Sequence, residues 1–324
     1  MGDPLVYVLD GLAYTGLFGI VAISLNLEYG FTNIANFGKA AFFMVGAYAY
    51  AIAAGAGLLQ PIPLLLSVII TAMVGLIACL PALRLREDYL AISLIALGEI
   101  IRLIIKNEEW IAGGVWGISA PSLVTITALS HRTYLYLQLA LIYGLLLVCY
   151  LISQLVAYSP YGRVLRTIRE DEVLAYTLGK NVFMYKAQIV ALSSAMTGLS
   201  GGLYAQYRNF INPFTFDPLM TFTIWIMVIL GGPANNTGAI LGSFIVEFFE
   251  RATRMAKDYL SLPVDPNNLR VILIGLLIIL MVAYRPQGIL KESPVRWRFP
   301  LSGYLKHIKL GMNLRRGRGW HMRS

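Results

Sequence analysis

Charge is scarce in this 324-residue chain, because only 13% of its residues are Asp, Glu, Lys or Arg, whereas 57% are hydrophobic. Soluble domains carry about 25% charged residues. From Ala40 to Leu83 the sequence runs for 44 residues without any charge. A membrane-spanning helix needs about 20 continuously apolar residues, whereas a barrel strand needs about 10 of alternating polarity. The composition therefore excludes a soluble enzyme and a β-barrel, and it predicts an all-α polytopic membrane protein.

Cysteine and histidine are also rare. Cys79 and Cys149 lie in separate apolar runs without a second ligand nearby, which excludes a disulfide framework and a metal site. His131 lies in a loop, and the other two histidines lie near the C terminus. No Ser/His/Asp or metal-binding constellation is present. We therefore expect no catalytic residues, no metal and no cofactor held by this chain.

The apolar runs predict about eight to ten transmembrane helices. Pro61 and Pro63 divide the 44-residue run into two spans. The run 218–246 is interrupted by Gly231-Gly232-Pro233, which predicts either a tight hairpin or a broken helix. The predicted spans are 5–27, 40–59, 62–83, 89–105, 133–158, 187–207 and 267–284, together with one or two in 218–246.

Positive charge is concentrated at the C terminus. Residues 285–324 hold ten Lys or Arg and a single acid, Glu292, and so account for the whole net charge of +9. This segment predicts a basic cytoplasmic tail beside anionic lipid, following a membrane domain at 1–284. It has no nucleic-acid-binding motif. The same rule places the N terminus outside and Lys39, Arg84, Arg86 and the loop 159–186 in the cytoplasm.

Two segments, 29–47 and 230–246, bring Gly and Asn to the edge of an apolar helix. Paired Gly-interrupted segments are typical of transporters built from repeats, with the substrate path at the breaks. The alternative is close helix packing through small residues, as at Gly198 and Gly202. The candidate path residues are Asn33, Asn36, Phe37, Gly38, Gly231 and Gly232.

Glu99 is the one acid that the predicted spans place in mid-membrane, three residues before Arg102. Charged side chains in a membrane need a partner. A structural ion pair across one helical turn explains both residues. A polar substrate contact or a proton relay is the functional alternative.

The loop 159–186 follows Pro160 with apolar residues at helical spacing and ends at Gly179, a residue suited to a helix C terminus. Its middle is acidic, at residues 169–172. Helices that lie on a lipid surface prefer a basic polar face. This loop is therefore predicted to be a short helix that docks on a cytosolic protein.

These residues resemble the permeases of branched-chain amino acid ABC importers. The similarity covers roughly residues 20–291 and includes the order of the motifs. The matching segments are Asn36-Phe37-Gly38, Tyr89-Leu-Ala-Ile-Ser, Gly98-Glu-Ile-Ile-Arg102, Gly113-Gly114, the run from Gly162 to Glu172, Leu178-Gly179-Lys180-Asn181-Val182, Leu230-Gly231-Gly232 and Arg285-Pro286-Gln287-Gly288-Ile289-Leu290.

The resemblance implies a type II ABC importer-like permease in the cell membrane, with an internal repeat and broken Gly-rich helices. It implies a pore shared with a second permease subunit, and an extracytoplasmic solute-binding protein that delivers branched-chain amino acids. Two ATP-binding cassette subunits would use the ATP and dock on loop 159–186. The implied coupling residues are Arg163, Arg166, Arg169, Glu170, Asp171, Glu172 and Gly179.

Some positions depart from the family pattern. Gly231-Gly232-Pro233-Ala234-Asn235 replaces Gly-Gly-x-Gly-Ser, and Val115-Trp116 follows Gly114 where Pro-Asn or Thr-Asp is usual. These differences leave the substrate open, so a permease for urea or short amides is an alternative. A secondary transporter that works alone is a further alternative.

Overall fold

The computed structural model describes residues 4–59, 61–82, 85, 87–122, 131–259, 272, 275–276, 279, 283–285 and 287–292. The chain divides into two compact units, 1–292 and 293–324, and the second unit lies outside the described residues. Most of the predicted span 267–284 and of the basic tail therefore also lies outside them.

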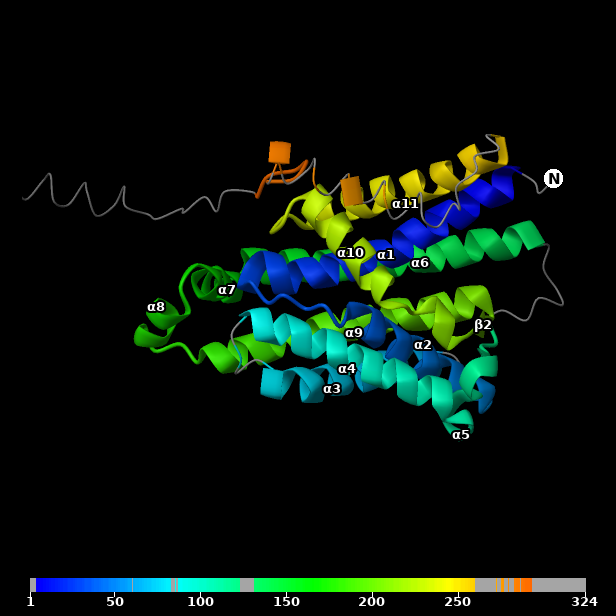
Figure 1. Ribbon diagram of the computed structural model, residues 1–324, viewed down its shortest axis with the longest axis horizontal. Helices are drawn as coiled ribbons and strands as arrows, with labels where there is room; N and C mark the ends of the chain where they lie inside the picture. The colour runs from blue at the N-terminus through cyan, green and yellow to red at the C-terminus, as the bar shows by residue number, and fades with distance from the viewer. Residues whose placement is uncertain are drawn as a thin grey trace, which may run out of the picture. The chain divides into compact units, whose positions relative to one another are not determined.

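Eleven α-helices make up almost all of the described part (Figure 1). Their bounds are α1 Pro4–Thr32, α2 Lys39–Gly55, α3 Ile62–Ala82, α4 Glu87–Asn107, α5 Glu109–Ala112, α6 His131–Tyr158, α7 Pro160–Glu170, α8 Glu172–Thr177, α9 Val182–Arg208, α10 Pro218–Gly231 and α11 Asn236–Tyr259. Two 3-10 turns, η1 Gly114–Trp116 and η3 Pro213–Thr215, and two short strands, β1 Ile118–Ser119 and β2 Phe210–Ile211, complete it.

Apolar composition and length identify the membrane helices. Leu5–Thr32, Ile62–Pro81 and Arg132–Tyr158 are long and apolar enough to cross a bilayer, and α2 and α10 are apolar but shorter. The 29 residues of α1 extend over about 43 Å, more than the hydrocarbon core of about 30 Å. The all-α membrane-protein class is therefore confirmed, while the number of spans stays a prediction.

The run 218–246 forms a helical hairpin. The turn at residues 232–235 separates α10 from α11, and the two helices pack antiparallel. A Cβ atom on Gly231 would lie 2.0 Å from the Gly238 carbonyl oxygen, and one on Gly242 would lie 1.9 Å from that of Met227. Only glycine permits this approach, so the hairpin interpretation is confirmed and the broken helix is excluded.

Helix α9 packs against α1, α2 and α3 through small residues. A Cβ atom on Gly198 would lie 2.5 Å from Thr71, and one on Gly202 would lie 2.6 Å from the Ser67 hydroxyl. On the side that faces α2, a Cβ atom on Gly201 would lie 2.1 Å from the Phe43 carbonyl oxygen. The predicted small-residue packing at Gly198 and Gly202 is thus a feature of the core.

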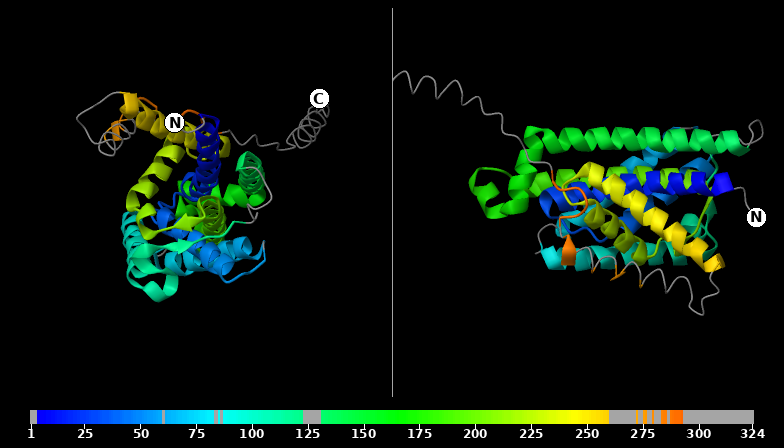
Figure 2. Two further views of the ribbon diagram at one scale, coloured as in Figure 1. Left: turned by 90° about the vertical axis from the view of Figure 1, so that its right-hand side faces the viewer. Right: turned by 90° about the horizontal axis from the view of Figure 1, so that it is seen from above.

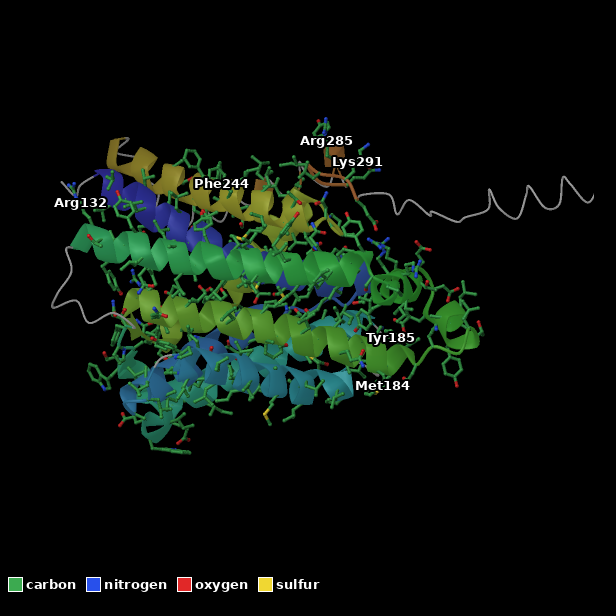
Figure 3. The ribbon with its side chains drawn as sticks, turned by 180° about the vertical axis from the view of Figure 1, so that it is seen from behind. Arg132, Met184, Tyr185, Phe244, Arg285 and Lys291 are labelled. Atoms are coloured by element: carbon green, nitrogen blue, oxygen red, sulfur yellow. The ribbon has the colours of Figure 1, made fainter. Side chains whose placement is uncertain are left out.

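The two ends of the helices differ (Figures 1 and 2). At one end α7 and α8 extend beyond the other helices, while α5 and the antiparallel pair of β1 and β2 lie at the opposite end. Figure 3 shows Met184 and Tyr185 near the first end and Arg132 at the second. If the long helices cross a membrane, these ends are its two faces.

Candidate functional site

The chain between α1 and α2 is not helical, and neighbouring groups satisfy its polar atoms. Asn33 has a left-handed backbone with φ of +57°. The Asn36 side chain is fully buried and accepts a hydrogen bond from the Gly38 N–H at 2.9 Å. From α10, the Trp225 indole N–H donates to the Asn36 carbonyl oxygen at 3.2 Å. Irregular backbone at membrane depth is tolerated where protein groups pair it in this way.

A buried ion pair joins the end of α1 to the start of α2. Lys39 Nζ lies 3.0 Å from Glu28 Oε2, and both side chains are 0% exposed. Lys39 also donates to the Ser193 hydroxyl of α9, and Asn36 donates to Glu28 Oε1 at 3.2 Å. Lys39 is therefore buried among the helices and not exposed to water, while the membrane side on which it lies stays a prediction. Glu28, just beyond the predicted span 5–27, is a fully buried acid that the sequence analysis did not single out beside Glu99.

Phe37 and Gly38, two of the predicted path residues, line an open pocket between α2, α4 and α10. The pocket is open and shallow, and its cavity volume of about 20 Å³ is enough for little more than one water molecule. Its other lining residues are Ala40, Ala41, Ile95, Gly98, Glu99, Arg102, Phe216, Pro218, Thr221 and Phe222.

Glu99 and Arg102 face this pocket as an ion pair on α4. Arg102 Nε donates to Glu99 Oε2 at 2.8 Å, and a second hydrogen bond joins the same two side chains. The pair is partly buried, with 18% of the arginine and 34% of the glutamate side chain exposed. The two side chains neutralise each other's charge beside the apolar and aromatic residues of the pocket.

The second Gly-rich segment lies apart from the pocket lining. Gly231 contacts α11, and Gly232 has φ of +113° with the Leu290 carbonyl oxygen 2.1 Å from where a Cβ would stand. Asn26 of α1 reaches the same turn, where it accepts from the Ala234 N–H at 2.8 Å and donates to Asn236 at 2.8 Å. The two Gly-rich segments are therefore joined through α1, and the second one packs α10 closely against α11.

The loop 159–186 contains two helices rather than one. The chain leaves the helical conformation at Asp171, whose carboxylate accepts from the N–H groups of Val173 and Leu174 at 2.8 and 3.0 Å. Aspartate at this position caps α8 and ends α7. Gly179 has φ of +75°, a conformation suited to glycine, and follows the end of α8.

The apolar residues of this loop divide between an inner and an outer surface. On α7, Leu165 and Ile168 are buried against the other helices. On α8 and just after it, the large apolar side chains are half to three-quarters exposed. They are Val173, Leu174, Tyr176 and Leu178, which we call the α8 tip. The prediction of one helix with a single apolar face missed this exposed tip.

The predicted coupling residues also divide by position. Arg163, Glu170 and Asp171 are exposed, and Glu172 forms an ion pair with Lys186 of α9. Arg166 and Arg169 are partly buried, with 12% and 23% of their side chains exposed. They contact Glu292 rather than the outer surface, and Arg169 also donates to the Gly30 carbonyl oxygen at 2.6 Å.

An aromatic contact fixes the start of α7 to α9. The Tyr161 hydroxyl donates to the Tyr185 carbonyl oxygen at 3.3 Å, and the two rings lie 5.2 Å apart. Burial raises the pKa of Tyr161 to about 12, so its hydroxyl stays protonated and able to donate at neutral pH. Helix α7 is thus fixed at its start, and its other end leads to the exposed tip.

Apolar helices long enough to cross a bilayer and short helices that extend beyond one end are the architecture expected of a membrane permease. A family described as the permease component of the branched-chain amino acid transport system matches residues 7–282. The chain belongs to this family.

Several relatives support the assignment. The probable branched-chain amino acid transport permease protein LivM of Methanocaldococcus jannaschii is 32% identical over 327 residues, covering 88% of this chain and 93% of the relative. The high-affinity permease protein LivM of Escherichia coli is 27% identical, covering 87% and 69%. The probable LivH permease of M. jannaschii is 27% identical, covering 75% and 79%. No solved structure matches the chain.

Proposed function

We propose that this chain is one permease subunit of an ATP-driven importer for branched-chain, hydrophobic amino acids. The observation that carries the proposal is the family match over residues 7–282. Two permeases of M. jannaschii, LivM and LivH, are both similar to the chain. We infer that it pairs with a second, related permease and receives substrate from an extracytoplasmic solute-binding protein.

The α8 tip is proposed as the contact for the ATP-binding cassette subunits, which would bind and hydrolyse the ATP. Exposed Val173 and Tyr176, at 72% and 73%, are the kind of apolar and aromatic groups that a partner pocket buries. The exposed charges of Arg163, Glu170 and Asp171 would surround this contact. In this proposal Arg166 and Arg169 hold α7 in place, and Glu172 holds α8 to α9.

The pocket between α2, α4 and α10 is proposed to lie on the translocation path. Phe37 and Gly38 would face the substrate, and Asn33 and Asn36 would fix the backbone that presents them. Gly231 and Gly232 would support the path by packing α10 against α11. Tyr89, Ile92 and Ile100 of α4 are exposed, and a second permease could cover this surface.

The proposal also places the α7–α8 end, and with it the basic tail, in the cytoplasm of the cell. The +9 charge of the last 40 residues supports this orientation through attraction to anionic lipid. A permease for urea or short amides remains the alternative for the substrate. A lone secondary transporter is disfavoured, because the family is described as one component of a transport system.

The first experiment is purification of the tagged chain from native membranes in mild detergent, with mass spectrometry of the retained proteins. We expect two ATPase chains and a second permease. Uptake by vesicles that contain this complex should be inhibited by leucine, isoleucine or valine and not by urea or acetamide. Recovery of the chain alone, under conditions that keep other membrane complexes intact, would contradict the proposal.

The Tyr176→Ala variant tests the docking surface in the same purification. Loss of one buried aromatic contact should weaken retention of the ATPase chains about fivefold or more, while the second permease is retained. Tyr158→Ala is the matched control, because Tyr158 is 60% exposed at the same end of the molecule but outside the tip. Equal loss of ATPase in both variants would remove the role of the tip.

A further inference from the structure

Glu292 lies where three parts of the permease meet. Its carboxylate pairs with Arg166 Nε at 3.1 Å and with Arg169 Nη2 at 3.0 Å, both on α7. The two arginines are 12% and 23% exposed and the glutamate is 33% exposed, so the cluster is largely shielded from water. Charged hydrogen bonds from two guanidinium groups to one carboxylate are directional and stronger than neutral ones.

The backbone just before Glu292 is fastened to the α10–α11 turn. The N–H groups of Ile289 and Leu290 donate to the carbonyl oxygens of Leu230 and Gly231 at 2.9 and 3.0 Å. Asn235 of the turn donates to the Lys291 carbonyl oxygen at 2.9 Å. These bonds fix residues 289–291 to the turn. Glu292, the next residue, therefore connects the turn to α7 through its ion pairs.

Helix α10 connects this turn with the pocket. Its far end supplies Pro218, Thr221 and Phe222 to the lining, and the Thr221 hydroxyl accepts from the Ala40 N–H of α2 at 3.0 Å. A helix of 14 residues with tight contacts behaves as one rigid element. A shift of α7 that pulls Glu292 is therefore delivered to the pocket wall through α10.

We propose that Glu292 is a positioning residue that couples α7 to the α10–α11 hairpin, so that movement of the docked ATPases changes the pocket. This inference rests on the proposed importer function. A second attachment, from Arg169 to Gly30 and from Arg166 over the Phe31 ring at 5.1 Å, ties α7 to α1. Because that attachment does not need Glu292, α7 keeps its place on α1 without the carboxylate, while its direct link to the α10–α11 turn is lost.

The test uses the complete importer in membrane vesicles and measures amino acid uptake, ATP hydrolysis and the amount of complex. Glu292→Gln removes the charge with little change of size. We expect retained ATPase chains and continued ATP hydrolysis, with uptake per ATP reduced about fivefold or more, the lower range of typical coupling between sites. Glu292→Asp keeps the negative charge and should restore part of the uptake per ATP hydrolysed.

Lys291→Gln is the matched control. It also removes one charge, at an exposed neighbour near Arg285 at the edge of the helices (Figure 3). The control should keep the uptake ratio of the unaltered importer. An unchanged ratio in Glu292→Gln, a fall in the amount of complex alone, or the same loss in Lys291→Gln would each overturn the proposal. If no ATPase chain is retained even by the unaltered protein, the importer function itself fails instead.

Discussion

The buried pair of Glu28 and Lys39 shows how single residues hold the break between α1 and α2. Both are 0% exposed, and each is the main counter-charge of the other. Removing one partner of such a pair leaves an uncompensated buried charge and typically costs about 3–5 kcal/mol. We expect Lys39→Met to lower the free energy of unfolding by about this amount, measured by thermal unfolding of the purified protein in detergent.

The double variant Glu28→Gln/Lys39→Met distinguishes charge from packing. Removing both charges is often far less costly than removing one, so the double variant should recover most of the lost stability. Lys180→Met is the control, because Lys180 is exposed after α8 and should leave stability unchanged. Equal stability of Lys39→Met and Lys180→Met would show that the pair does not hold the break.

Sequence patterns could not reveal this pair. Scarce charges in an apolar chain normally mark membrane boundaries, and that rule placed Lys39 in water. Its partners include Glu28 and Ser193. Ser193 comes 154 residues later, on α9, and only the tertiary fold brings that helix against α2. By contrast, Glu99 and Arg102 could be paired in advance, because three residues on one helix fix their proximity.

At the scale of elements, the α10–α11 hairpin depends on glycine. The Cβ of Gly231→Ala would stand 2.0 Å from the Gly238 carbonyl oxygen, so the helices must separate. We expect a loss of about 1–3 kcal/mol, the usual cost of overpacking, in thermal unfolding measurements. Gly144→Ala on α6 is the control, since nothing lies within 4 Å of its added methyl group, and it should not destabilise. Equal stability of the two variants would contradict the packing role.

Helix boundaries were predictable where long charge-free runs set them, as for α2, α3 and α6. The break between α7 and α8 was not, because the apolar residues continue at helical spacing across Asp171. The competing signal was the aspartate itself, whose side chain caps the helix that follows it. Likewise, the sequence of α7 predicts its polar face. It does not predict that Glu292, 126 residues beyond Arg166, pairs with that face.

At the scale of the whole molecule, the described helices hold the three proposed sites at different positions along the structure. The α8 tip lies at one end, the Glu292 cluster lies beside α7, and the pocket lies between α2, α4 and α10. In this arrangement, ATPase subunits docked on the α8 tip could act through α7 and Glu292 on the pocket between the helices. It requires that the α7–α8 end face the cytoplasm and that α5 face outward.

Cysteine labelling of intact cells tests that requirement. Lys180→Cys, just after α8 and outside the tip, should resist a membrane-impermeant maleimide until the cells are opened. Trp110→Cys on α5, where the native side chain is 82% exposed, should react at once. The native Cys79 and Cys149 are buried, at 1% and 3% exposed, so the unaltered protein should give little signal in either condition. The reverse pattern would place α8 outside, where no ATP-driven subunit could reach it, and the coupling route through Glu292 would lose its motor.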